Sequence, residues 1–172
     1  RAWFAAQPEG GPEKIIRINA LSSEWGADDL AAARACRPDA VLLPKVDTPR
    51  DVRDVDEMLD EDDADLRIWA MVETPRAMLN LGPLAELGRD RAARLACLVA
   101  GTNDLAKETG IATTNDRRFL APHLAQMVMA ARAGGLDVLD GPFNDFGNAT
   151  VFEDQCRQAA QMGFDGKTLI HP

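Results

Sequence analysis

Two acidic residues, Glu73 and Asp104, stand where a pair of carboxylates could act together. Each follows a run of apolar residues, 68–72 before Glu73 and 95–100 before Asp104. The two are 31 positions apart, a spacing that fits one strand, one helix and two short loops in a repeated β/α architecture. Neighbouring parallel strands lie about 4.8 Å apart. Side chains that leave the carboxyl ends of two such strands can therefore share a ligand.

The ligand that this pair favours is Mg²⁺. Magnesium binds hard oxygen donors and takes one or two protein carboxylates together with substrate oxygens and waters. Zinc is disfavoured because the sequence has only two histidines and no cluster of them. Two structural interpretations of Glu73 and Asp104 stay open, helix capping and pairing with an arginine, because ion pairs also gather carboxylates.

A cation stands within the first apolar segment of the chain. Arg17 lies in the run 15–19, and we expect its guanidinium to be buried there and to need an anionic partner. The partner is a substrate anion in one interpretation and Glu73 or Asp104 in the other. Lys45, which follows Pro44, is either a charge at the end of the sheet or a weaker candidate for a substrate contact.

Two glycine-containing loops complete the candidate site. The first, 101–105, begins with Gly101 and contains Asn103 and Asp104, and its amides and the helix start that follows can bind a carboxylate or phosphate. The second, 141–146, begins with Gly141 and Pro142 and carries two phenylalanines, which suits the rim of a pocket. A strand end and a packed loop are the plain structural interpretations of these two segments.

These loops depend on an alternation of apolar runs and helical segments. Capping threonines before prolines, at 48–49 and 74–75, mark two helix starts, and 27–35 and 122–132 are alanine-rich helix formers. The polar stretches 60–65 and 113–118 are expected to be surface turns. Six strands are predicted, each apolar enough to be buried on both faces of a parallel sheet: 14–18, 40–43, 66–72, 95–100, 136–139 and 167–170.

Strands that alternate with helices indicate an α/β fold with right-handed crossovers, either an open doubly wound sheet or a closed eight-stranded barrel. A complete barrel needs about 250 residues, so in 172 residues we expect an incomplete barrel that forms a single domain over 1–172. The chain is expected to begin on a helix end, at 1–6, and to stop directly after its last strand at His171. Both ends therefore look cut.

Composition excludes several classes of partner. The 172 residues are 46% hydrophobic and carry a net charge of −9, which argues against nucleic acid and against an anionic membrane as the main partner. There is no apolar run of membrane-spanning length and no signal-peptide pattern, so a cytoplasmic protein is expected. The three cysteines lack paired spacing and are expected to be reduced.

Six ordered segments together resemble one enzyme family. They resemble the citrate lyase β-subunit-like enzymes of the HpcH/HpaI aldolase superfamily, which include malyl-CoA and citramalyl-CoA lyases and malyl-CoA thioesterases. No single segment is specific, but the ordered set is. The segments are 16–19 (IRIN), 43–46 (LPKV), 71–76 (MVETPR), 101–107 (GTNDLAK), 140–146 (DGPFNDF) and 163–172 (GFDGKTLIHP).

The resemblance implies a magnesium-dependent (β/α)8 barrel, trimeric or hexameric, in which the six strands here are strands three to eight. Two β/α units before them, and a carboxyl-terminal lid that carries an acid/base aspartate, have no counterpart in this chain. By position, Glu73 and Asp104 are implied as metal ligands and Arg17 as the catalytic and substrate-binding arginine. The implied substrate-binding residues are Arg17, Val72, Glu73, Asn103, Asp104, Gly141 and Pro142.

The activity implied by the resemblance is cleavage of a 3-hydroxyacyl-CoA of the malyl-CoA or citramalyl-CoA type into an acyl-CoA and an α-keto acid. Two alternatives stay open: hydrolysis of the malyl-CoA thioester, and a citrate lyase β subunit that works within a multisubunit complex. A barrel that acts on phosphoenolpyruvate is disfavoured, because no glycine-rich phosphate loop lies near the last strands.

Overall fold

The computed structural model describes residues 11–90 and 92–170. Within them, six strands form one parallel sheet whose spatial order follows the sequence, β1-β2-β3-β4-β5-β6. The helix end expected at 1–6 and His171 fall outside the described residues. The strands are β1 (Ile15–Arg17), β2 (Ala40–Leu43), β3 (Arg67–Val72), β4 (Leu95–Ala100), β5 (Asp137–Asp140) and β6 (Gly166–Lys167).

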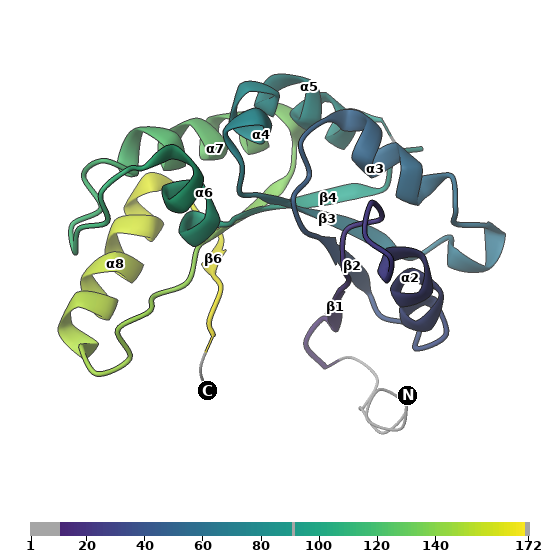
Figure 1. Ribbon diagram of the computed structural model, residues 1–172, viewed down its shortest axis with the longest axis horizontal. Coiled ribbons are helices and arrows are strands. Elements are labelled where there is room, and N and C mark those ends of the chain that lie inside the picture. The colour runs from purple at the N-terminus through teal and green to yellow at the C-terminus, as the bar shows by residue number, and fades with distance from the viewer. Residues whose placement is uncertain (1–10, 91, 171–172) are drawn as a thin grey trace.

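Helices connect successive strands and lie along the outside of the curled sheet, as Figure 1 shows. The result is a half-barrel, which confirms the prediction of an incomplete α/β barrel. Short 3-10 turns, η1 (Glu61–Asp63) and η2 (Leu87–Arg89), precede β3 and β4. The helices are α2 (Gly26–Arg34), α3 (Pro49–Asp56), α4 (Pro75–Leu79), α5 (Leu81–Glu86), α6 (Thr102–Thr109), α7 (Ala121–Gly134) and α8 (Ala149–Met162).

Two of these helices begin at capping threonines that the sequence predicted. The Thr48 amide donates to Asp51 Oδ2 over 2.7 Å, which closes a capping box at the start of α3. The Thr74 hydroxyl accepts from the Ala77 amide over 3.0 Å at the start of α4. Since Thr74 directly follows Glu73, this cap fixes the direction in which the chain leaves the site.

The core lies between the sheet and the helices. Alternate strand residues such as Ile68 and Val138 are fully buried there, against helix residues such as Leu30 and Leu124. The prediction that the strands are buried on both faces was wrong for β1, β3, β5 and β6, and only β2 and β4 come close to it. In β3, for example, Trp69 and the other alternate residues are half-buried. A half-barrel explains this, because six strands leave the concave face partly open to water.

Candidate functional site

All six strands end at the same edge of the sheet, as the sequence predicted. A cavity of about 320 Å³ opens at this edge between the ends of β1, β3 and β4 and the segments that follow β5 and β6. It is lined by five of the predicted site residues, Arg17, Glu73, Asn103, Asp104 and Pro142. The tertiary structure thus brings together side chains that are up to 125 positions apart in the chain.

Glu73 is the buried member of the carboxylate pair. It directly follows β3, is only 5% exposed, and its Oε1 accepts a hydrogen bond from the Lys45 amide over 2.8 Å. Lys45 adopts a left-handed backbone conformation, with φ of 50°, two residues after the end of β2. This conformation costs energy for a residue other than glycine and directs a backbone donor at the carboxylate.

Asp104 provides the second carboxylate, from the first turn of α6. Burial raises the pKa of Glu73; the hydrogen bond from the Lys45 amide opposes this effect, and the adjacent Asp104 carboxylate raises the pKa further. Two carboxylates this close repel each other unless a proton or a cation lies between them. The donor set therefore fits a hard divalent cation such as Mg²⁺.

No third acidic, histidine or cysteine side chain joins the pair within 11–90 and 92–170. A site with two protein carboxylates leaves the other positions of an octahedral ion to waters and substrate oxygens. Such a site suits a metal that binds its substrate directly.

Gly101 allows the two carboxylates to approach each other. A Cβ atom at this position would lie 2.2 Å from Glu73 Cβ and 2.7 Å from Glu73 Oε2. The Gly101 amide also donates to the Val72 carbonyl over 2.9 Å, which extends the pairing of β3 and β4 past their ends. Close backbone approach therefore requires glycine here.

Arg17 lies at the end of β1 and faces the same cavity. The expectation that its guanidinium is buried was wrong: the residue is exposed, because the strand ends at the open edge of the sheet. Its side chain forms no ion pair with another residue of 11–90 or 92–170, so the structural bridge to Glu73 or Asp104 is absent from the described part of the chain. The guanidinium remains available for an anionic ligand.

Asn103 and Gly141 join the α6 side of the cavity to the segment after β5. The Asn103 amide group donates to Asn144 Oδ1 over 3.2 Å, and the Asn144 amide group donates back over 2.8 Å. A Cβ atom at Gly141 would lie 2.3 Å from Thr102 Oγ1, so this backbone packs directly against the start of α6. Gly141 is itself buried and does not line the cavity, whereas the next residue, Pro142, does.

Val72 is the predicted site residue whose side chain packs in the core. Its side chain is fully buried in the core and does not line the cavity. Its contribution near the site is the carbonyl that accepts from Gly101. Strand alternation explains this, because Met71 faces the cavity and the next side chain must face the helices.

Sequence reasoning missed one residue that supports the site. Arg117 lies in the stretch 113–118, which was expected to be a surface turn, yet it is only 5% exposed and its guanidinium reaches Asp140 at the end of β5. A single arginine in a polar loop gives no sequence signal of burial. The available signal lay in its partner, because Asp140 ends an apolar strand and therefore needs a buried cation or donor.

Known proteins place this arrangement in a family. The family described as HpcH/HpaI aldolase/citrate lyase matches residues 3–172. The chain belongs to this family. Among the described helices, none is long and apolar enough to cross a membrane.

Two curated relatives in this family carry different activities in their names. The (3S)-malyl-CoA thioesterase of Cereibacter sphaeroides is 42% identical over 159 residues, which cover 92% of this chain and 53% of the relative. The mitochondrial citramalyl-CoA lyase of Rattus norvegicus is 29% identical over 175 residues, which cover 95% of this chain and 52% of the relative. The chain thus spans about half the length of these relatives.

A solved member of the same fold contains a metal and cofactor. The protein CitE of Mycobacterium tuberculosis, in complex with magnesium, acetoacetate and coenzyme A, superimposes with a TM-score of 0.76 at 26% identity. The match covers 92% of this chain and 56% of that protein. The half-barrel described above is therefore shared with a larger protein that binds Mg²⁺ and CoA.

Proposed function

We propose that the cavity binds Mg²⁺ through Glu73 and Asp104 and hydrolyses a thioester of the malyl-CoA type. The observation that carries the proposal is the buried Glu73 carboxylate beside Asp104, in one cavity with an exposed Arg17 that has no ion-pair partner among the described residues. The 42% identity with a malyl-CoA thioesterase supports hydrolysis as the reaction.

Each group of the cavity has a role in this proposal. A bound Mg²⁺ supplies a Lewis acid that polarises a carbonyl oxygen. Glu73 is held for this task by the Lys45 amide, and Asp104 by the first turn of α6. Arg17 binds the carboxylate or the thioester oxygen of the substrate, where a charge-assisted hydrogen bond is strong. Asn103 and Pro142 bound the space that the acyl group occupies.

A second reaction fits the same groups. Cleavage of the carbon-carbon bond of a 3-hydroxyacyl-CoA gives an acyl-CoA and an α-keto acid, and the similarity to a citramalyl-CoA lyase favours it as the second candidate. Action as a citrate lyase β subunit is a special case of it, which requires partner subunits. A trimeric or hexameric assembly belongs to the proposal as well, and light scattering of the purified protein checks it.

One assay separates the two reactions. The purified protein is incubated with malyl-CoA, with and without Mg²⁺, and the products are quantified. Hydrolysis releases free malate and a free CoA thiol, whereas cleavage gives glyoxylate and acetyl-CoA without a free thiol. We expect thiol release that depends on Mg²⁺. Glyoxylate without thiol release assigns the lyase reaction instead, and no turnover of malyl-CoA by either route contradicts the proposed substrate class.

The metal assignment is tested by Asp104→Asn. We expect Mg²⁺-dependent turnover to fall by at least about 100-fold, because a neutral amide is a poor ligand and loses the charge that holds the ion. Asp154→Asn is the matched control, since Asp154 lies on the exposed face of α8 in a surface pair with Arg157. Full activity of Asp104→Asn would remove Asp104 from the metal site.

A further inference from the structure

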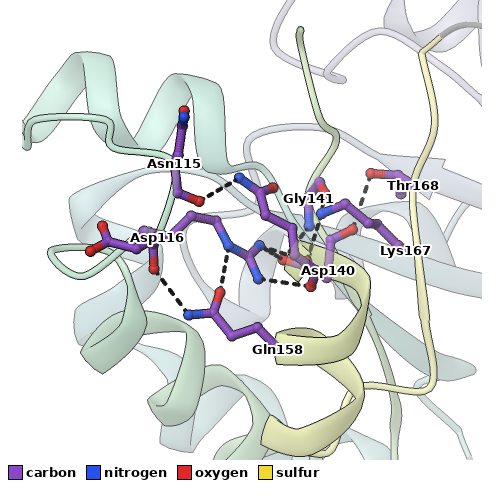
Figure 2. Close-up of polar contacts among 9 residues, drawn as sticks. Asn115, Asp116, Asp140, Gly141, Gln158, Lys167 and Thr168 are labelled. Atoms are coloured by element: carbon purple, nitrogen blue, oxygen red, sulfur yellow. Dashed lines mark hydrogen bonds and ion pairs between the residues drawn. The ribbon is translucent and has the colours of Figure 1, made fainter. Parts of the chain in front are cut away.

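One carboxylate beside the cavity is paired with two buried cations. Asp140, at the end of β5, is fully buried, and Arg117 Nη1 lies 2.8 and 2.6 Å from its two oxygens. Lys167 Nζ donates to the same carboxylate over 2.7 Å. The side chains of Arg117 and Lys167 are only 6% and 8% exposed. Figure 2 shows Asp140 at the centre of this group.

The pairing exceeds what charge balance requires. One buried carboxylate neutralises one cation, and burial of a second cation costs desolvation energy that a single hydrophobic side chain would avoid. Burial also lowers the pKa of Lys167, and the nearby Arg117 lowers it further, although the Asp140 carboxylate opposes both effects. A buried polar network that carries such a cost is retained where the backbone geometry that it fixes is needed.

The contacts of the cluster show which geometry is fixed. The Gly141 amide donates to Asp140 Oδ1 over 2.8 Å, and Lys167 Nζ donates to the Gly141 carbonyl over 2.5 Å. Thr168 donates to the Asp140 carbonyl through its amide, over 2.9 Å, and through its hydroxyl, over 3.1 Å. These bonds hold the backbone of Asp140 and Gly141, directly before Pro142, against Lys167 and Thr168.

These backbone segments face the metal carboxylates. Pro142 and Thr168 line the same cavity as Glu73 and Asp104. No hydrogen bond or ion pair joins Glu73 or Asp104 to Arg117, Asp140 or Lys167, and Glu73 is held instead by the Lys45 amide. The cavity therefore has a metal side, built on β3 and α6, and a separate wall built on β5 and β6.

The helix α8 holds Arg117 from outside. Gln158 Oε1 accepts from Arg117 Nε over 2.8 Å. Gln158 Nε2 donates to the Asp116 carbonyl over 3.0 Å, and Figure 2 shows Gln158 beside Asp116. Gln155 Nε2 donates to the Asn115 carbonyl over 3.1 Å. Arg117 itself has a φ of 53°, so its backbone is held in a conformation that an arginine seldom adopts.

We propose that Arg117, Asp140 and Lys167 are positioning residues that set the substrate-facing wall of the cavity opposite the metal carboxylates. The proposal rests on the proposed function and deepens it: Glu73 and Asp104 would hold the ion on the metal side, and this wall fixes how the acyl group lies. Loss of the cluster should then weaken substrate binding and leave metal binding intact.

The test is Lys167→Met, which keeps the length of the side chain and removes its charge. We expect KM for malyl-CoA to rise by about tenfold or more, because a small displacement of a positioning wall weakens every substrate contact made with it. The Mg²⁺ affinity, measured by titration calorimetry, should stay within about twofold of wild type. Lys167→Arg keeps the charge and should recover part of the lost affinity.

Two further variants accompany Lys167→Met, one as a control and one as a second test of the cluster. Lys107→Met makes the same chemical change on the exposed face of α6 and should leave KM unchanged. Gln158→Met removes the partner of Arg117 Nε from a half-exposed helix position and should raise KM in the same direction by a smaller factor. If Lys167→Met does not fold, the KM of Gln158→Met tests the positioning role in its place.

Hydrogen exchange measures the protection of the backbone amides in this wall and does not depend on turnover. The Gly141 and Thr168 amides should lose protection in Lys167→Met, while the Gly101 amide keeps its own. If wild type turns over malyl-CoA but Lys167→Met leaves KM unchanged, or weakens Mg²⁺ binding and substrate binding alike, the positioning role is overturned. If wild type shows no Mg²⁺-dependent turnover, the proposed function fails, and unchanged exchange at Gly141 and Thr168 then overturns the wall assignment as well.

Discussion

At the scale of single residues, the site depends on how closely two backbone segments approach each other. Glu73 is held by a backbone donor from Lys45 on one side, and Gly101 leaves room for it on the other. The carboxylate is thereby brought beside Asp104 while nearly excluded from water. A buried carboxylate next to a second one is poorly solvated and repelled, which favours capture of a cation.

Gly101→Ala tests this close approach. The added methyl group overlaps Glu73 Cβ, so we expect a loss of about 1–3 kcal/mol in the free energy of unfolding, together with weaker Mg²⁺ binding. Gly147→Ala is the control, because a Cβ atom there meets only Asp145 Oδ1 at 3.7 Å, and it should change stability by less than about 1 kcal/mol. Chemical unfolding and titration calorimetry measure both effects. Equal stability of the two variants would contradict the steric argument.

At the scale of elements, an ion pair connects the last two strands to α7, the helix that directly precedes β5. Asp165 precedes β6, and its two oxygens accept from Arg132 at the end of α7, over 2.7 Å, and from the Val138 amide in β5, over 2.8 Å. Arg132 also donates to the Gly163 carbonyl over 2.6 Å. One ion pair thus joins α7, β5 and the turn into β6, which starts the strand that carries the cavity wall.

This tie predicts a pH dependence of stability. The hydrogen bond from Arg132 lowers the pKa of Asp165, with the Val138 amide acting in the same direction. A carboxyl group whose folded pKa is depressed contributes stability above its unfolded pKa, near 3.9, and loses it as the pH falls through the folded pKa. Asp165→Asn should therefore cost about 1 kcal/mol at pH 7.

The measurement is urea unfolding of wild type and Asp165→Asn between pH 7 and pH 2. The difference between them should shrink as the pH falls below about 4. Because half-exposed ion pairs are screened, it should also shrink in 1 M salt. A difference that is independent of pH would assign the role of Asp165 to its amide contact alone.

At the scale of the whole molecule, one apolar core runs beneath the described helices and the strands β2 to β5. It extends from Leu30 in α2 to Leu124 and Ala131 in α7 and includes side chains from β2 to β5. A continuous core of this kind indicates one cooperative unit, as expected for a single domain.

Two distant core substitutions test this unity. Leu30→Ala and Leu124→Ala each remove a fully buried side chain and should each cost about 2–5 kcal/mol. In a single domain both lower the midpoint of one common thermal transition, followed by circular dichroism and by tryptophan fluorescence. Two separated transitions, each moved by only one of the substitutions, would divide the chain into two folding units.

The sequence by itself determined the repeat of the fold and the residues at its carboxyl edge. Strands of 4 and 6 residues at 40–43 and 95–100 were predicted with the observed boundaries, because short apolar runs bounded by turn residues have few other solutions. The last strand was placed too late, at 167–170 instead of Gly166–Lys167, since Leu169 and Ile170 are apolar but exposed. Apolar sequence predicts burial only when a partner surface exists.

Only the tertiary structure decided which polar residues are buried and what they hold. Arg17 looked buried in an apolar strand and is exposed, whereas Arg117 looked exposed in a polar loop and is buried against Asp140. Local sequence reports the period and the ends of each element. The partner of a charge, across 23 positions from Arg117 to Asp140, is set by how the elements pack, and that packing depends on contacts that no local pattern encodes.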